Sequence, residues 1–157
     1  MANAQAGSYY PPVGFYFNVD VTLNEPVKHI TGNNEGNFQE VSGINVRLGV
    51  KEVEEGGENR FVHKFPIPPK YDNLILKRGM LKGSPLINWA KSTVEQFNFK
   101  TATVVVSLMD EEANPLATWK FTNAYPVSIK ISDFKAQENS IVVETLELCY
   151  DYFKKEK

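Results

Sequence analysis

Apolar and polar side chains alternate along much of this chain. In residues 15–23, FYFNVDVTL, large apolar side chains take every second position and mostly polar ones stand between them. Successive side chains of a strand point to opposite faces, so this period of two predicts a strand with one buried face. Further extended patterns occupy residues 37–42, 45–54, 61–65, 73–77, 102–109, 116–122, 127–130 and 140–149. Together they predict a mainly β domain, either a sandwich or a barrel.

One segment carries a helical pattern instead. Ser84 and Pro85 have the residue types typical of an N-cap and a first helical position. Leu86, Ala90, Val94 and Phe97 then follow at helical spacing. This pattern predicts one amphipathic helix, within residues 84–97, flanking the sheets.

A long hairpin is predicted around residues 51–61. The segment EEGGEN at residues 54–59 is acidic and glycine-rich, and it stands between two extended runs. Such a segment is typical of a hairpin tip, so we expect it to project from the body. The prolines that follow, in FPIPP at residues 65–69, predict a stiffened bend. Gly43 predicts a turn or bulge between the two runs before the tip.

Composition and length bound the class of protein. A chain of 157 residues fits a single domain, residues 1–157. Its 17 basic and 19 acidic residues leave a net charge of −2, which does not favour a nucleic-acid groove. Residues 1–14 predict an extended N-terminal arm. They lack the pattern of a secretory signal, and no run reaches the roughly 18 apolar residues of a membrane span. We therefore expect synthesis in the cytosol and no membrane anchor.

The residues that carry chemistry in enzymes do not form a catalytic pattern. His63 shares a strand face with Phe61 and Phe65, which favours a partly buried structural histidine over a general base. The single cysteine, Cys149, excludes an intramolecular disulfide and is expected to be packed and inert. The carboxylates at residues 110–112 are expected to be solvated in a turn. We predict no catalytic, cofactor-binding or metal-binding residues, and no cofactor.

Five segments resemble the tail tube protein family of contractile-tailed phages and contractile injection systems. They are PVGFYFNV at residues 12–19, FQEVSGI at 38–44, EEGGEN at 54–59, YDNLILKRG at 71–79 and WKFTNAYP at 119–126. The resemblance implies a β-sandwich or barrel-like fold with one flanking helix. It also implies a homohexamer whose subunits join their sheets into a ring-shaped β-barrel, with rings stacking into a tube inside a sheath.

The resemblance also implies which residues make contacts. The acidic loop is expected to reach the adjacent ring, and basic side chains to offer it complementary charge. The expected contact residues are Glu54, Glu55, Glu58, Asn59, Lys70, Lys77 and Arg78. Asn18, Asp20 and Thr22, on the polar side of the first strand, are candidates to face the lumen.

The implied partners are sheath, baseplate and tube initiator or terminator proteins, with an effector protein or DNA as cargo in the lumen. The particle would be extracellular or cytoplasmic. The extended N-terminus and the basic end at residues 154–157 leave open an initiator ring that joins baseplate to tube. A small-ligand-binding β-barrel is a less favoured alternative, and an enzyme ranks last.

Overall fold

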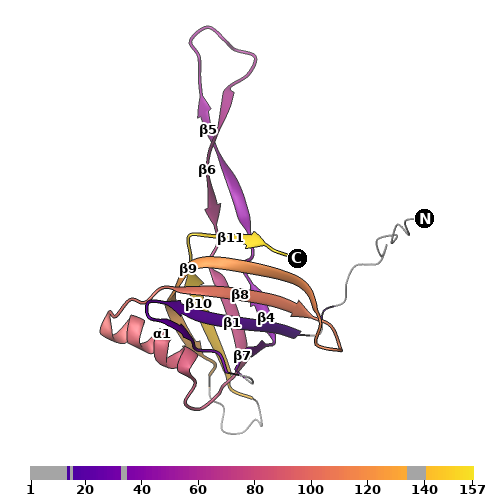
Figure 1. The fold of residues 1–157 in the computed structure, drawn as a ribbon. Coiled ribbons are helices and arrows are strands. Elements are labelled where there is room, and N and C mark those ends of the chain that lie inside the picture. Colours follow the sequence, from indigo (N-terminus) through magenta and orange to yellow (C-terminus); the bar gives the residue numbers. More distant parts are fainter. Residues whose placement is uncertain (1–13, 15, 33–34, 134–140) are drawn as a thin grey trace, which may run out of the picture.

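The computed structural model describes residues 14, 16–32, 35–133 and 141–157 (Figure 1). In chain order the elements are β1 (Tyr16–Asn24), β2 (Val27–His29), β3 (Asn37–Phe38), β4 (Glu40–Ser42), β5 (Val46–Val53), β6 (His63–Tyr71), β7 (Leu74–Gly79), α1 (Pro85–Gln96), β8 (Ala102–Met109), β9 (Pro115–Ile131), β10 (Val143–Cys149) and β11 (Tyr152–Lys155). In the described residues the fold is thus mainly β with one helix, as the sequence predicts.

Strand β9 belongs to two sheets. Its residues 115–124 pair with β8, and those at 119–122 also pair with β11. Residues 125–131 pair instead with β10. We call β2, β1, β8, the start of β9 and β11 the first sheet, and the end of β9, β10, β7 and β4 the second sheet. Asn123, with φ of 54°, lies where β9 passes from one sheet to the other. The sequence predicts two separate strands here, because polar Asn123 interrupts the apolar alternation.

The core lies between the inner faces of the two sheets. Val19 and Val21 of β1, Val104 and Val106 of β8, Phe121 of β9, Leu74 and Leu76 of β7, and Leu146 and Leu148 of β10 are almost fully buried. The alternation predicted for residues 15–23 is confirmed from Tyr16 onward, while Phe15 lies outside the described residues. Burial of these aliphatic side chains is the main favourable term holding the sheets together.

Helix α1 has the predicted position, and its buried face includes two of the four predicted positions, Leu86 and Ala90. Leu86, Trp89, Ala90 and Thr93 are buried, at the i, i+3, i+4, i+7 spacing of one helix stripe. The predicted core positions Val94 and Phe97 are wrong, since their side chains are 49% and 81% exposed.

The two polar-bearing side chains of this stripe are hydrogen-bonded, and the bond of Trp89 ties the helix to the segment after it. The indole of Trp89 donates to the carbonyl of Lys100 at 2.9 Å, and the hydroxyl of Thr93 donates to the carbonyl of Trp89 at 3.1 Å. Both bonds lie on the buried stripe. Apolar spacing alone therefore identified only Leu86 and Ala90 of the buried stripe, because a tryptophan and a threonine fill the other half.

The predicted hairpin forms a long ribbon that stands clear of the body (Figure 1). Strands β5 and β6 pair from Val46 and Tyr71 to Val53 and His63. The predicted bend at the prolines is wrong, because β6 runs through Pro66, Pro68 and Pro69 as one strand. A register shift opposite Leu48 and Gly49 leaves one extra residue in β6. Such a bulge, in a two-stranded ribbon with free edges, tolerates prolines that lack a backbone donor.

Gly43 joins β4 to the ribbon in a conformation that favours glycine. Its φ is 86°, and a Cβ there would collide with the carbonyl oxygen of Asn73. We expect Gly43→Ala to lower the free energy of unfolding by about 1–3 kcal/mol. Urea denaturation of the monomer measures this change. Gly56→Ala is the matched control, because its Cβ would meet no atom within 4 Å; equal losses in both variants would contradict the prediction.

Tyr150 places its phenol among the rings of Tyr71, Phe121 and Phe153. In the described part of the chain its buried hydroxyl has no hydrogen-bond partner. Burial, followed by the charge of Asp72, raises the pKa of Tyr150 to about 12. The unfolded phenol titrates near 10, so the folded state favours the neutral form.

Stability from Tyr150 is therefore fully present below pH 10 and is lost as the pH rises from about 10 to about 12. We expect Tyr150→Phe to keep the packing and to weaken this alkaline decline. At pH 7 the variant should be as stable as the wild type or more so, because it removes a buried hydroxyl without a partner. Thermal unfolding midpoints at pH 7 to 12 test this. An unchanged alkaline decline in the variant would show that other groups cause it.

Candidate assembly interface

The ribbon exposes apolar side chains on both of its faces. Pairing places Val46, Leu48, Val50 and Pro66 on one face, and Phe61, His63, Phe65 and Ile67 on the other. Leu48 and Phe65, one from each face, are 63% and 52% exposed. A two-stranded ribbon alone is at best marginally stable in water, and large exposed apolar surfaces mark protein contacts. Both faces of the ribbon therefore have the character of a contact surface.

An aromatic row covers the second face. The ring of His63 lies 5.0 Å from that of Phe61 and 6.1 Å from that of Phe65, between centroids. The three side chains thus share a face, as the sequence predicts. Further down, Gly49 leaves room for Ile67 to cross the ribbon, since a Cβ at Gly49 would lie 2.6 Å from Ile67 Cγ1.

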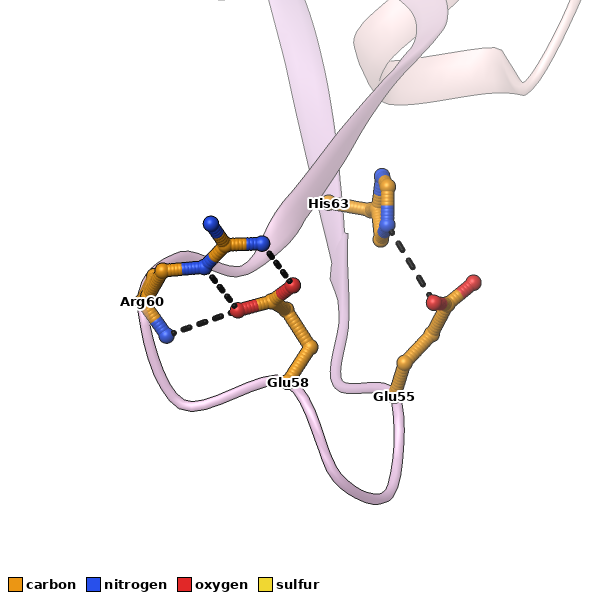
Figure 2. Close-up of polar contacts among 4 residues, drawn as sticks. All are labelled: Glu55, Glu58, Arg60 and His63. Atoms are coloured by element: carbon orange, nitrogen blue, oxygen red, sulfur yellow. Dashed lines mark hydrogen bonds and ion pairs between the residues drawn. The ribbon is translucent and has the colours of Figure 1, made fainter.

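At the tip, the predicted acidic side chains are partly paired within the loop (Figure 2). Arg60 donates from Nε and Nη2 to the two carboxylate oxygens of Glu58, each at 2.9 Å, and its backbone N–H adds a third bond at 3.1 Å. These bonds to Arg60 lower the pKa of Glu58. Glu55 lies 3.5 Å from Nε2 of His63. The tip is therefore ordered by local contacts while Glu54, Glu55 and Asn59 remain exposed.

Lys70 lies at the base of the ribbon, exposed and directly opposite Arg47. Arg47 was not among the predicted contact residues. It makes a 3.2 Å ion pair with Asp72, whose other carboxylate oxygen accepts a 2.6 Å hydrogen bond from the amide of Asn45. The exposed apolar side chains of the ribbon were also missed. Their alternation is that of a half-buried strand, although nothing in the described part of the chain covers them.

Arg78 does not lie on the surface, which contradicts its predicted role in pairing with a neighbouring subunit. Its side chain is 3% exposed, and Nε is 3.3 Å from a carboxylate oxygen of Glu144, which is equally buried. Nη2 donates to the hydroxyl of Ser84 at 2.7 Å, and Nη1 donates to the carbonyl of Glu35. The guanidinium also lies over the ring of Phe38, 5.1 Å from its centroid. Arg78 thus ties β7 to β10, to the start of α1 and to the segment before β3.

The Ser84 hydroxyl consequently does not cap α1. It accepts from Arg78 and donates to a carboxylate oxygen of Glu35 at 3.1 Å, while the Ser84 carbonyl accepts the helical N–H of Asn88. Ser84 holds the predicted N-cap position, but its side chain completes the buried polar cluster.

Lys77, the neighbour of Arg78, points to the opposite face of the second sheet. It makes a 2.8 Å ion pair with Glu40 and is about two-fifths exposed. On the outer face of the first sheet lie Asn18, Asp20 and Thr22, as the alternation predicts. Asp20 is 3.8 Å from Nε2 of His29. The chain thus has two polar sheet faces, and the prediction that β1 faces the lumen stays a prediction.

The residues that the structure describes hold no group of three His, Cys, Asp or Glu side chains that could bind a metal ion. No helix among those residues combines the length and apolar character needed to cross a membrane.

The comparisons with known proteins agree with this fold. The T4-like virus tail tube protein gp19 family matches residues 13–154. The structure of the anti-feeding prophage baseplate contains a chain that is 29% identical, with a TM-score of 0.78, and the match covers 93% of this chain and 95% of that one. No curated protein sequence matches significantly.

Two more distant structures share the fold. A chain from the sheath-tube complex of an extracellular contractile injection system is 24% identical over 99% of this chain and 98% of that one, with a TM-score of 0.73. An Hcp protein is 13% identical, with 90% and 92% covered and a TM-score of 0.58.

The class of protein follows from the fold and from these matches: this is a β-rich structural protein rather than an enzyme. The chain belongs to the T4-like virus tail tube protein family, whose match spans nearly its whole length.

The positions of Arg78 and Lys77 predict losses of stability of very different size on mutation. Arg78→Met leaves Glu144 buried without its partner, so we expect a loss of about 3–5 kcal/mol in the free energy of unfolding. Lys77→Met breaks only an exposed pair, and we expect a loss of at most about 1 kcal/mol. Urea denaturation of both variants tests this. Similar losses in the two would contradict the assignment of Arg78 to the subunit interior.

Proposed function

We propose that this chain is a tube subunit of a contractile injection particle. Copies assemble into six-membered rings around a channel, and the rings stack into an inner tube that delivers an effector protein or DNA when the surrounding sheath contracts. Family membership supports the tube role, and the similar structures named above come from a baseplate and from a sheath-tube complex. By this likeness, sheath, baseplate and tube-end proteins are its partners, and the assembled particle acts outside the cell that makes it.

The ribbon is the observation that carries the proposal. It stands clear of the body, exposes apolar side chains on both faces and ends in an acidic tip (Figure 1). A monomer would leave all of this surface in water. In a stack of rings the ribbon lies against the adjacent ring, which buries the apolar faces. The residues proposed to contact the adjacent ring are Glu54, Glu55, Glu58 and Asn59 at the tip and Lys70 at the base of the ribbon. Lys77 and Arg78 are not included, because they form ion pairs with Glu40 and Glu144 of the same subunit.

A tube-initiator role is the second candidate. One observation favours it: the similar chain with 29% identity comes from a baseplate structure. An initiator is confined to one end of a particle and a repeating subunit occurs along its length. Antibody labelling of isolated particles along their length separates the two roles.

Negative-stain electron microscopy of the purified protein over a concentration series tests the proposed assembly. We expect rings, and stacks of rings at higher concentration. Protein that stays monomeric throughout would contradict self-assembly and would favour the small-ligand-binding alternative.

Charge reversal at the tip, with Glu54→Lys, Glu55→Lys and Glu58→Lys together, tests the stacking contact. We expect rings to form and stacks to be lost. A loss of about 2 kcal/mol of binding free energy at each contact between adjacent rings would raise the concentration needed for stacking roughly thirtyfold.

The matched control reverses two carboxylates on a different turn, with Glu111→Lys and Glu112→Lys, and should stack normally. Tubes of wild-type length from the tip variant would show that the tip does not contact the next ring.

A further inference from the structure

The ribbon is joined to the body at a narrow base. Residues 43–45 lead from β4 into β5, and residues 72–73 lead from β6 into β7. Among the described elements, β5 and β6 make extensive contacts only with each other. The direction in which the ribbon stands (Figure 1) is therefore set at these two connections, because no other described element packs along its length.

The strand pairing is interrupted at this base. The ladder between β4 and β7 ends with Ser42 opposite Ile75, and the next pair in this described part of the chain is Val46 opposite Tyr71, where the ribbon begins. Hinges in proteins are usually a few residues at the ends of elements, which absorb a change in backbone dihedral angles. The two connections have the position of such a hinge.

The side chain of Asp72 bridges the gap. One carboxylate oxygen accepts a hydrogen bond from the side-chain amide of Asn45 at 2.6 Å, and the other accepts one from Nη2 of Arg47 at 3.2 Å. The backbone N–H of Asp72 also donates to the carbonyl of Asn45 at 3.2 Å. Both oxygens of the carboxylate are thus used to hold the connection leaving the ribbon against the connection entering it.

Apolar packing holds the base against the body. Ile44 and Tyr71 pack against the core, and the ring of Tyr71 lies 5.5 Å from that of Phe153, between centroids. The hydrophobic effect is not directional, whereas a hydrogen bond weakens steeply when it is misaligned. The contacts of Asp72 therefore supply the directional restraint that apolar packing gives only weakly.

The contacts of Asp72 lie at the surface. The side chains of Asp72 and Arg47 are 40% and 71% exposed. An ion pair this exposed contributes little to the stability of a fold. A small free-energy difference is nevertheless enough to change the populations of two conformations that are close in energy. Breaking the contacts should therefore alter the directions that the ribbon samples far more than it alters folding.

Resting on the proposed tube function, we propose that Asp72 is a positioning residue: with Asn45 and Arg47 it forms a clamp that holds the ribbon in the direction required for stacking. Residues 43–45 and 72–73 are the hinge. The ribbon turns about them as a unit, since eight paired positions hold its strands together. Contacts form more readily when the contacting element already has its bound orientation, because less conformational freedom is lost.

Distances between spin labels test the clamp in the unassembled subunit. In a Cys149→Ser background, one label is attached at Gly56→Cys in the tip, where an added Cβ meets no atom within 4 Å. The other is attached to the body, at Lys91→Cys of α1 or, in a separate protein, at Lys120→Cys of β9, both exposed. Two body positions are used because one distance misses a swing at right angles to it. Pulsed electron paramagnetic resonance, at concentrations too low for ring formation, gives the spread of each distance.

We expect narrow distance distributions without further mutation and broad ones in Asp72→Ala. Arg47→Ala changes only an exposed side chain and should also broaden them, and adding it to Asp72→Ala should have no further effect. Arg47→Ala alone decides the outcome if Asp72→Ala does not fold. The matched control is Glu52→Ala, which breaks an exposed ion pair with Lys64 within the ribbon and should leave the distributions narrow. Narrow distributions in Asp72→Ala, or equal broadening in the control, would overturn the clamp.

Electron microscopy of Asp72→Ala tests the role of the clamp in stacking. If the variant holds the ribbon in the stacking direction about one-tenth of the time, the concentration needed for stacking rises about tenfold, while rings still form. Stacking at the wild-type concentration despite broad distance distributions would overturn the inference and leave the tube function intact. Absence of stacks in the wild type would contradict the tube function, and the distance distributions would still decide whether the clamp exists.

Discussion

The structure depends on β9 being a strand of both sheets. Its first residues complete the sheet of β1, β8 and β11, and its last residues complete the sheet of β10, β7 and β4. One continuous backbone therefore sets the angle between the sheets, and the core fills the space that this angle leaves. Helix α1 packs against β9 as well. A change in the path of β9 would move the core, the helix and both polar faces together.

The buried ion pair of Arg78 and Glu144 has a related role. Burying two charges is costly, and an apolar pair of similar size often gives equal stability. This pair instead fixes the relative orientation of the segments it joins. The five donors of a guanidinium require acceptors at set angles, and here Glu144 of β10, the hydroxyl of Ser84 and the carbonyl of Glu35 provide them. We infer that Arg78 fixes how the segment before β3 meets the sheet, and so where β4 lies.

Sequence reasoning predicted the strands well where one face is buried. In β1 alternation alone identified the element, because burial of one face requires an apolar side chain at every second position. It failed for Arg78, since a lysine and an arginine side by side in a strand point to opposite faces and only one can stay in water. It also failed for β2 and β11, which are short and largely exposed and leave no apolar period. The acidic, glycine-rich segment at residues 54–59 predicted that the ribbon projects, but its two apolar faces became evident only from the exposure of their side chains in the described structure.

The continuity between the ribbon and the second sheet has a mechanical consequence. Hydrogen bonds of antiparallel strands lie perpendicular to the chain, so tension along both strands of the ribbon passes into β4 and β7 together and acts as shear on the ladder between β7 and β10. Shear strains many bonds at once, whereas a peeling force breaks them one after another. In the proposed tube, a thrust or pull along the ribbon would thus load many hydrogen bonds inside each subunit at once.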